Sequence, residues 1–87
     1  MKNSNKTIID VRSEGEFVMG HAEGAINIPL NEVESRAEEI SKIEGEIILC
    51  CASGNRSGMA QQILKSKGIE CHNGGSWFAA ENYALAL

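Results

Sequence analysis

The residues most able to do chemistry lie in one short polar segment, Cys51-Ala52-Ser53-Gly54-Asn55-Arg56-Ser57. A cysteine beside the unpaired N–H groups of a helix start has a lowered pKa, because those groups stabilise the thiolate. Gly54 allows successive backbone N–H groups to converge into an anion-binding nest, and Arg56 adds a planar cation. The segment therefore predicts a thiolate nucleophile at Cys51 in a loop that can hold an anion.

The other cysteines and the histidines carry weaker signals. Three cysteines is an odd number, and neighbouring Cys50 and Cys51 are poorly placed for a disulfide, so we expect free thiols in a reducing compartment. Cys71 is interpreted as a buried strand residue, with a resolving thiol as the alternative. His21 is interpreted as a turn residue that hydrogen-bonds locally rather than as a general base. A metal site using these cysteines and His72 is disfavoured, because adjacent cysteines rarely reach one metal, and no metal or cofactor is expected.

The segments that must position this loop alternate between strand and helix patterns. Short apolar runs predict four strands, at 7–11, 25–29, 46–50 and 69–72. Helices are predicted between Ser13 and Gly20, from Asn31 to 43, over 57–67 and from Ser76 to the chain end. This alternation predicts an α/β fold with a parallel sheet, in which the unbroken run 46–50 is the central strand. Ligands bind such sheets beyond the carboxyl ends of the strands, which is where Cys51 falls.

Side-chain patterns add expectations about packing. Two helices should turn apolar stripes to the core, Val33, Ala37, Ile40 and Ile43 in one and Met59, Ala60, Ile63 and Leu64 in the other. Residues 73–75, Asn-Gly-Gly, are read as a turn. Asp10 and Arg12 follow the first strand and are expected to form a structural ion pair. Trp77 and Phe78 are expected in the core, with a pocket wall as the alternative.

Length and composition exclude several classes of protein. Eighty-seven residues suit one domain, 1–87, and 43% hydrophobic residues with nine glycines argue against disorder. The net charge of −4 and the lack of a basic cluster exclude nucleic-acid binding. No apolar run is long enough for a membrane span or a signal peptide. We expect a cytoplasmic monomer without membrane partners, or a periplasmic one if a preceding segment has been removed.

Two blocks of sequence resemble the rhodanese-like domain family. They are Ile9-Asp10-Val11-Arg12 with Glu16-Phe17, Gly20-His21 and Gly24-Ala25-Ile26-Asn27-Ile28-Pro29, and the loop Cys51-Ala52-Ser53-Gly54-Asn55-Arg56-Ser57. The resemblance runs from about Thr7 to Gly75 and is similar to the family's short phage-shock-protein-E-like thiosulfate sulfurtransferases. In that family the loop cysteine takes a sulfane sulfur from a donor as a persulfide and passes it to an acceptor. The resemblance thus implies that Cys51 is catalytic and that residues 52–57 bind the substrate.

The resemblance also implies a fold and a set of partners. The family has helices on both faces of its sheet, and this chain lacks the usual first helix and edge strand, which implies four strands in the order 4-3-1-2. Trp77 follows the two glycines more closely than in the family's common pattern. Implied donors are thiosulfate or a persulfide, and implied acceptors are cyanide or a thiol, for example on a thioredoxin-like protein.

Two alternatives to sulfur transfer stay open. Cysteine-dependent phosphatases and arsenate reductases separate their cysteine and arginine by five residues; the spacing from Cys51 to Arg56 is four, but from Cys50 it is five. Two features count against Cys50 as the nucleophile. Gly54 is the fourth residue after Cys50, whereas it is the third after Cys51, and Cys50 continues the apolar run of the strand. The second alternative is a non-catalytic sulfur-relay module that only binds a partner, although this chain retains the cysteine.

Overall fold

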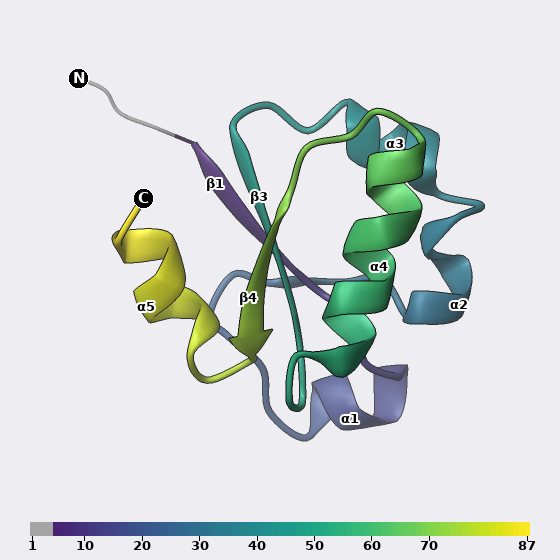
Figure 1. Ribbon diagram of the computed structural model, residues 1–87. Coiled ribbons are helices and arrows are strands. Elements are labelled where there is room, and N and C mark those ends of the chain that lie inside the picture. Colours follow the sequence, from purple (N-terminus) through teal and green to yellow (C-terminus); the bar gives the residue numbers. More distant parts are fainter. Residues whose placement is uncertain (1–4) are drawn as a thin grey trace.

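The computed structural model describes residues 5–87, which are built around a parallel sheet of four strands (Figure 1). The strands are β1 Lys6–Asp10, β2 Ile26–Asn27, β3 Glu46–Cys51 and β4 His72–Ser76. Their order across the sheet is β2-β1-β3-β4, which confirms the expected order 4-3-1-2. All neighbours are parallel, so the carboxyl ends of the strands share one edge.

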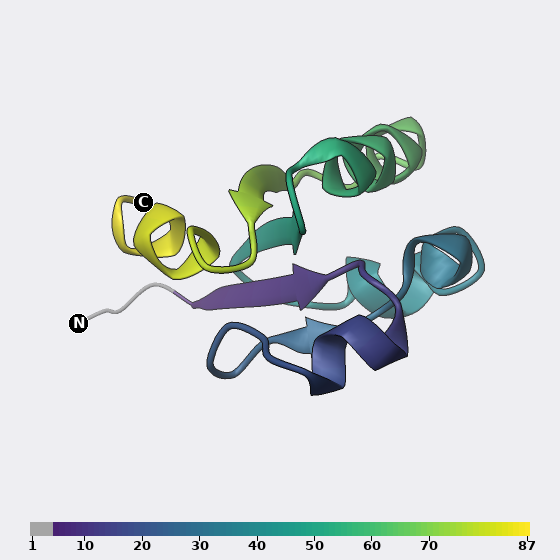
Figure 2. The ribbon, with the colours of Figure 1, turned by 90° about the horizontal axis from the view of Figure 1, so that it is seen from below.

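Helices cover both faces of this sheet (Figure 2). They are α1 Glu14–Val18, α2 Leu30–Val33, α3 Ala37–Ser41, α4 Asn55–Ser66 and α5 Ala80–Leu85. Helices α2, α3 and α4 lie against one face, α5 lies against the other, and α1 lies at the edge where the strands end (Figures 1 and 2). None of the described helices is long and apolar enough to cross a membrane.

The pleat of β3 divides the buried side chains between two cores. Side chains of a strand alternate between faces, so Cys51 joins the larger core with α2, α3 and α4, whereas Cys50 joins a smaller core beneath α5. The larger core consists of Ile9, Val11, Ile28, Val33, Ala37, Ile40, Ile47, Leu49, Cys51, Ala60 and Leu64. The smaller core consists of Ile8, Ala22, Ile48, Cys50, Ala80 and Ala84.

The prediction of one continuous helix from Asn31 to 43 is wrong. Val33, Ala37 and Ile40 are buried as expected and Ile43 is half-buried, but the chain forms two short helices, α2 and α3, with a turn between them. The Ser35 hydroxyl donates to the Glu32 carbonyl at 3.1 Å, and Arg36 leaves the helical region at φ −107° and ψ 16°. Serine hydroxyls compete in this way with the hydrogen bonds of a helix backbone.

The predictions of a strand at 69–72 and a turn at 73–75 are also wrong. Strand β4 runs from His72 to Ser76 and contains both glycines. A Cβ on Gly74 would lie 2.6 Å from Cγ2 of Ile48, and Gly75 has φ +84°. The glycines are therefore strand residues that allow β4 to lie close against the central strand.

Two helix boundaries and two burial predictions differ more modestly. Helix α4 begins at Asn55 rather than at 57, and α5 begins at Ala80 rather than at Ser76. Met59, expected in the core, is 55% exposed, and Phe78 is 69% exposed. The face of α4 that turns inward contains Ser57 instead, next to Ala60 and Leu64.

Candidate active site

Cys51 is the last residue of the central strand and lies where β3 leads into α4. Gly54 precedes the helix in the left-handed region, at φ 102°, and its N–H donates to Sγ of Cys51 at 3.0 Å. Residues other than glycine rarely adopt this conformation. The turn folds the loop back over the thiol, so that Cys51 is fully buried while Ala52 and Ser53 remain exposed.

Hydrogen bonds to the sulfur make Cys51 an acidic thiol. Burial disfavours its ionisation, but hydrogen bonds from the Ser57 side chain and from the backbone N–H groups of Ser57, Ser53 and Gly54 outweigh it and lower the pKa to about 7. Thus the donors predicted from the helix start are present, and a substantial share of Cys51 is thiolate at neutral pH.

A polar network connects this thiol to the neighbouring strand. Oγ of Ser57 lies 3.6 Å from Sγ of Cys51 and 2.7 Å from Oδ1 of Asn73 on β4. The Asn73 amide also donates to the Gly54 carbonyl at 3.1 Å, and its Oδ1 accepts from the Gly75 N–H at 3.0 Å. The loop is therefore held to β4 by Asn73, a residue that no sequence pattern singles out for the site.

Ser57 has one hydroxyl proton for two acceptors. While Cys51 is a neutral thiol, its S–H can donate to Oγ of Ser57, whose own proton goes to Asn73. Once Cys51 has ionised, the hydroxyl turns to the sulfur, and Oδ1 of Asn73 keeps its bond from the Gly75 N–H. Ser57 can in this way satisfy either protonation state of the thiol.

Arg56 forms an ion pair that the sequence did not indicate. Its guanidinium donates to both carboxylate oxygens of Glu16, at 2.8 and 3.0 Å. This contact raises the pKa of Arg56 and lowers that of Glu16 to about 2, with further help from the Ser13 N–H. The cation beside the loop is therefore paired with a carboxylate from α1.

A capping box on α1 sets the position of Glu16. Ser13 caps the helix as predicted, its Oγ accepting from the Glu16 N–H at 3.3 Å. The Glu16 carboxylate accepts in return from the Ser13 N–H at 3.1 Å. The spacing Ser-x-x-Glu is the signal that could have placed Glu16 at this edge of the sheet, but nothing local indicates its partner 40 residues away.

The expected ion pair of Asp10 and Arg12 is confirmed. Arg12 Nη2 lies 2.7 Å from Oδ2 of Asp10, both side chains are buried, and the same Nη2 donates to the Gly20 carbonyl at 2.6 Å. The Trp77 ring lies over the guanidinium, 4.9 Å from its Cζ, and packs against Gly20. Trp77 therefore braces the ion pair and packs against the smaller core.

Cys50 faces the opposite side of the sheet. Burial, reinforced by the charge of Asp10, raises its pKa to about 12. Its neighbours include Ile48 and Ala80 of the smaller core. Cys50 is thus a neutral thiol at physiological pH, separated from the loop by the sheet.

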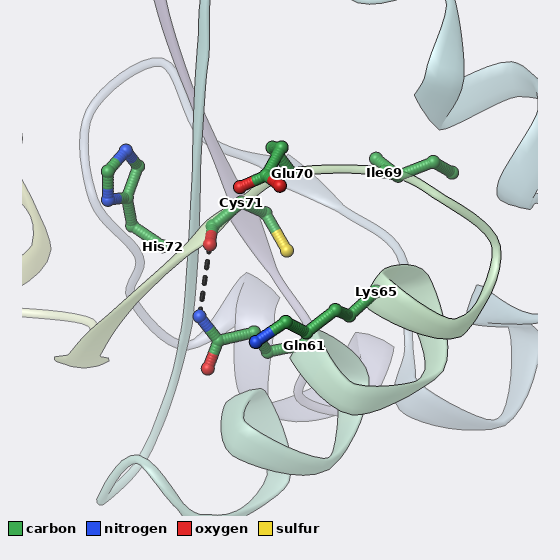
Figure 3. Close-up of a pocket in the computed structure, with 6 residues that line it drawn as sticks. All are labelled: Gln61, Lys65, Ile69, Glu70, Cys71 and His72. Atoms are coloured by element: carbon green, nitrogen blue, oxygen red, sulfur yellow. Dashed lines mark hydrogen bonds between the residues drawn. The ribbon is translucent and has the colours of Figure 1, made fainter.

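Cys71 lies in a separate cavity at the other end of β4 (Figure 3). The cavity, of about 250 Å³, is lined by Gln61, Lys65, Ile69, Glu70, Cys71 and His72. Gln61 Nε2 donates to the Cys71 carbonyl at 3.0 Å, and burial raises the pKa of the Cys71 thiol. Cys71 is a half-buried thiol just before β4, at the edge of the sheet where the strands begin.

The remaining candidate residues, His21 and Asn55, do not contact the Cys51 thiol in the hydrogen bonds of the described chain. His21 Nδ1 lies 2.8 Å from the Phe17 carbonyl, and its ring stacks on Phe17, as expected of a turn residue. Asn55 is exposed at the start of α4. Across residues 5–87, no three His, Cys, Asp or Glu side chains are grouped so that they could hold a metal ion.

The chain is similar in sequence to known proteins of one family. Residues 1–80 match the rhodanese-like domain. The chain is 43% identical over 63 residues to the putative sulfur carrier protein YrkF of Bacillus subtilis (strain 168), covering 72% of this chain and 34% of that protein. It is 39% identical over 61 residues to the thiosulfate sulfurtransferase PspE of Escherichia coli (strain K12), covering 69% and 59%. The matched part is thus a third to three fifths of these curated relatives.

Solved structures agree with the fold. A structure described as rhodanese with anions from E. coli has a TM-score of 0.76 and 34% identity, covering 86% of this chain and 91% of that one. A rhodanese-like domain protein from Staphylococcus aureus has a TM-score of 0.78 and 25% identity, covering 92% and 78%.

Proposed function

Because the chain belongs to the rhodanese-like domain family, we propose that it is a sulfurtransferase that carries a sulfane sulfur as a persulfide on Cys51. The observation that carries this proposal is the geometry of Cys51. Its sulfur accepts hydrogen bonds from the loop and helix start, which hold its pKa at about 7. The same N–H groups suit the outer sulfur of a persulfide, which is also an anion.

The reaction proceeds by double displacement. With thiosulfate as donor, the Cys51 thiolate bonds to the outer sulfur, and the S–S bond of the donor breaks with its electron pair leaving on sulfite. In the second half, an acceptor such as cyanide or a thiolate attacks the outer sulfur of the persulfide and restores the Cys51 thiolate. No external base is required, since a substantial share of Cys51 is already thiolate at neutral pH.

Cys51 is fully buried, so its sulfur must become accessible before it can react. We propose that the donor sulfur reaches Sγ when the exposed loop residues Ala52 and Ser53 shift. A hollow of about 340 Å³ lies against Arg56, lined by Val11, Ser13, Pro29, Leu30, Asn31 and Arg56. We propose that donor and acceptor approach from this side, and that residues 52–57 then bind the transferred sulfur.

The position of Cys50 argues against the phosphatase and arsenate reductase alternative. A phosphatase nucleophile must be a thiolate at the anion-binding loop, whereas Cys50 lies on the other face with a pKa of about 12. A non-catalytic sulfur-relay module would bind a partner without taking up sulfur. The acidic Cys51 favours catalysis over that second alternative.

Intact mass spectrometry tests the proposal. After incubation with thiosulfate or a small persulfide, the protein should gain the mass of one sulfur atom, and cyanide or dithiothreitol should remove it. Cyanide should be converted to thiocyanate in the same step. A protein that gains no sulfur from either donor would contradict the proposal and leave the interaction module in its place.

A further inference from the structure

The cations near the candidate site are already neutralised by carboxylates. Within residues 5–87 every arginine forms an ion pair: Arg12 with Asp10, Arg36 with Glu32 and Glu39, and Arg56 with Glu16. The lysines of the same part of the chain lie at the opposite end of the fold, at the start of β1, the ends of α3 and α4, and just beyond. They are Lys6, Lys42, Lys65 and Lys67.

The charge of the donor therefore matters at this site. Thiosulfate is a dianion, whereas a persulfide terminus, R–S–S⁻, carries one negative charge. A buried or half-buried site stabilises a second negative charge only where a cation or additional N–H donors oppose it. Here the Arg56 charge is matched by Glu16, and the thiolate of Cys51 adds a negative charge of its own.

We propose that Glu16 is a specificity-determining residue that neutralises Arg56 and so favours a monoanionic sulfur donor, a persulfide, over dianionic thiosulfate. The inference rests on the proposed function, since it concerns the donor of that same site. It assigns a role to a carboxylate that touches Arg56 rather than the reacting sulfur. The N–H groups around Cys51 remain the groups that hold the transferred sulfur.

The proposal can be tested with two donors that differ mainly in charge. Methanethiosulfonate, CH₃SO₂S⁻, resembles thiosulfate but has a methyl group in place of one charged oxygen. Each donor loses its outer sulfur to the Cys51 thiolate and leaves with the electron pair of the broken S–S bond, as methanesulfinate or as sulfite. Both form the same Cys51 persulfide, so the ratio of their kcat/KM values reports donor charge.

Glu16→Gln removes the charge and retains the local structure. Glutamine serves equally well in a capping box, so the bond from the Ser13 N–H and the start of α1 are kept. Arg56 then carries an unmatched charge. We expect kcat/KM for thiosulfate to rise about fivefold relative to that for methanethiosulfonate, the size expected for one partly screened unit charge.

Glu14→Gln is the matched control. Glu14 lies in the same first turn of α1, is exposed, and has no salt bridge within the described chain. It changes the net charge of the protein by the same amount, and the ratio of the two donors should stay close to its wild-type value. A general effect of protein charge would move both variants alike.

Salt provides a second measurement that needs no variant. In the wild-type protein, thiosulfate approaches a site where negative charge prevails, so its kcat/KM should increase with ionic strength more than that of methanethiosulfonate. Glu16→Gln should weaken this difference.

The outcomes separate the inference from the proposed function. If both donors load sulfur but Glu16→Gln leaves their ratio unchanged, or shifts it no more than Glu14→Gln does, the role of Glu16 is wrong and sulfur transfer stands. If neither donor loads sulfur onto the wild-type protein, the proposed function fails and the inference fails with it. A wild-type rate for thiosulfate that falls with salt would also overturn the inference.

Discussion

Cys50 and Cys51 are adjacent in sequence, both inaccessible to solvent, and opposite in chemistry. The pKa of Cys50 is raised to about 12, first by burial and then by Asp10, whereas that of Cys51 is held at about 7 by hydrogen bonds that outweigh its burial. The pleat of β3 turns one side chain to the apolar core beneath α5 and the other to the start of α4. Burial alone therefore does not determine whether a thiol is reactive; the donors on its side of the sheet do.

The ion pairs on the two sides of the sheet also differ. On the side of Cys50, the nearest ion pair is that of Asp10 and Arg12, which is buried. Arg12 also donates to the Gly20 carbonyl and lies against the Trp77 ring. On the side of Cys51, the side chains of the ion pair Arg56 and Glu16 are 36% and 40% exposed. The first pair supports the fold, and the second is accessible to solvent.

The largest effect should come from removing the Cys51 thiol. We expect Cys51→Ser to abolish sulfur loading, with thiocyanate formation falling at least about a thousandfold, because serine cannot form a persulfide. Intact mass and thiocyanate formation from cyanide measure this. Cys50→Ala and Cys71→Ser are the controls and should retain most activity. Equal loss in Cys50→Ala would move the nucleophile to the other face and revive the phosphatase alternative.

The side of Cys50 should instead respond in stability. Asp10→Asn leaves Arg12 as a buried charge without its counterion, and we expect the free energy of unfolding to fall by about 3 kcal/mol. Urea denaturation followed by circular dichroism measures this change. Glu39→Gln, which removes one partner of the half-buried Arg36 at an exposed position, should leave the denaturation midpoint nearly unchanged. Similar losses in both variants would show that the Asp10 pair has no special role.

Many features of the fold and of the candidate site could be predicted from the sequence. Local spacing predicts the cap at Ser13, the ion pair of Asp10 with Arg12 and the low pKa of Cys51. Family resemblance predicts the order of the strands. The position of Cys51 between β3 and α4 follows too, because the apolar run of β3 ends there.

The features that escaped prediction depend on tertiary contacts. Gly74 reads as a turn residue until the close approach of Ile48 is known, and Arg56 reads as a free cation until α1 brings Glu16 to it. Asn73 contacts Ser57 only because β4 lies beside β3. In each case the partner is distant in sequence, so no local pattern could indicate it.

A smaller change on the side of Cys51 would test the hydrogen bonds themselves. Ser57→Ala removes the hydroxyl that turns to the sulfur, and we expect the thiolate fraction of Cys51 at pH 6 to fall about fivefold. The ultraviolet absorbance of the thiolate, titrated against pH, reports the pKa. In Ser53→Ala the contributing group is a backbone N–H and is retained, so the titration should match the wild type. A Ser57→Ala curve that overlays the wild type would assign the low pKa to the backbone alone.

The smallest effect should be a difference in how stability depends on pH. The pKa of Cys51 is lowered from 9.0 to about 7 in the folded protein, so between these values the unfolded chain binds more protons at this site, and stability rises with pH. At pH 7.5 the gain should be under about 1 kcal/mol relative to Cys51→Ala. The pKa of Cys50 is raised instead, so above pH 9 only the unfolded chain loses that proton, and stability should fall there. Denaturation midpoints should be measured at pH 6, 7.5, 9 and 10.5. The midpoint of the wild type should rise between pH 6 and 9, and this rise should be lost in Cys51→Ala and kept in Cys50→Ala. The fall of the midpoint above pH 9 should be weaker in Cys50→Ala. Parallel curves for all three proteins would mean that the two thiols do not differ in the way their environments imply.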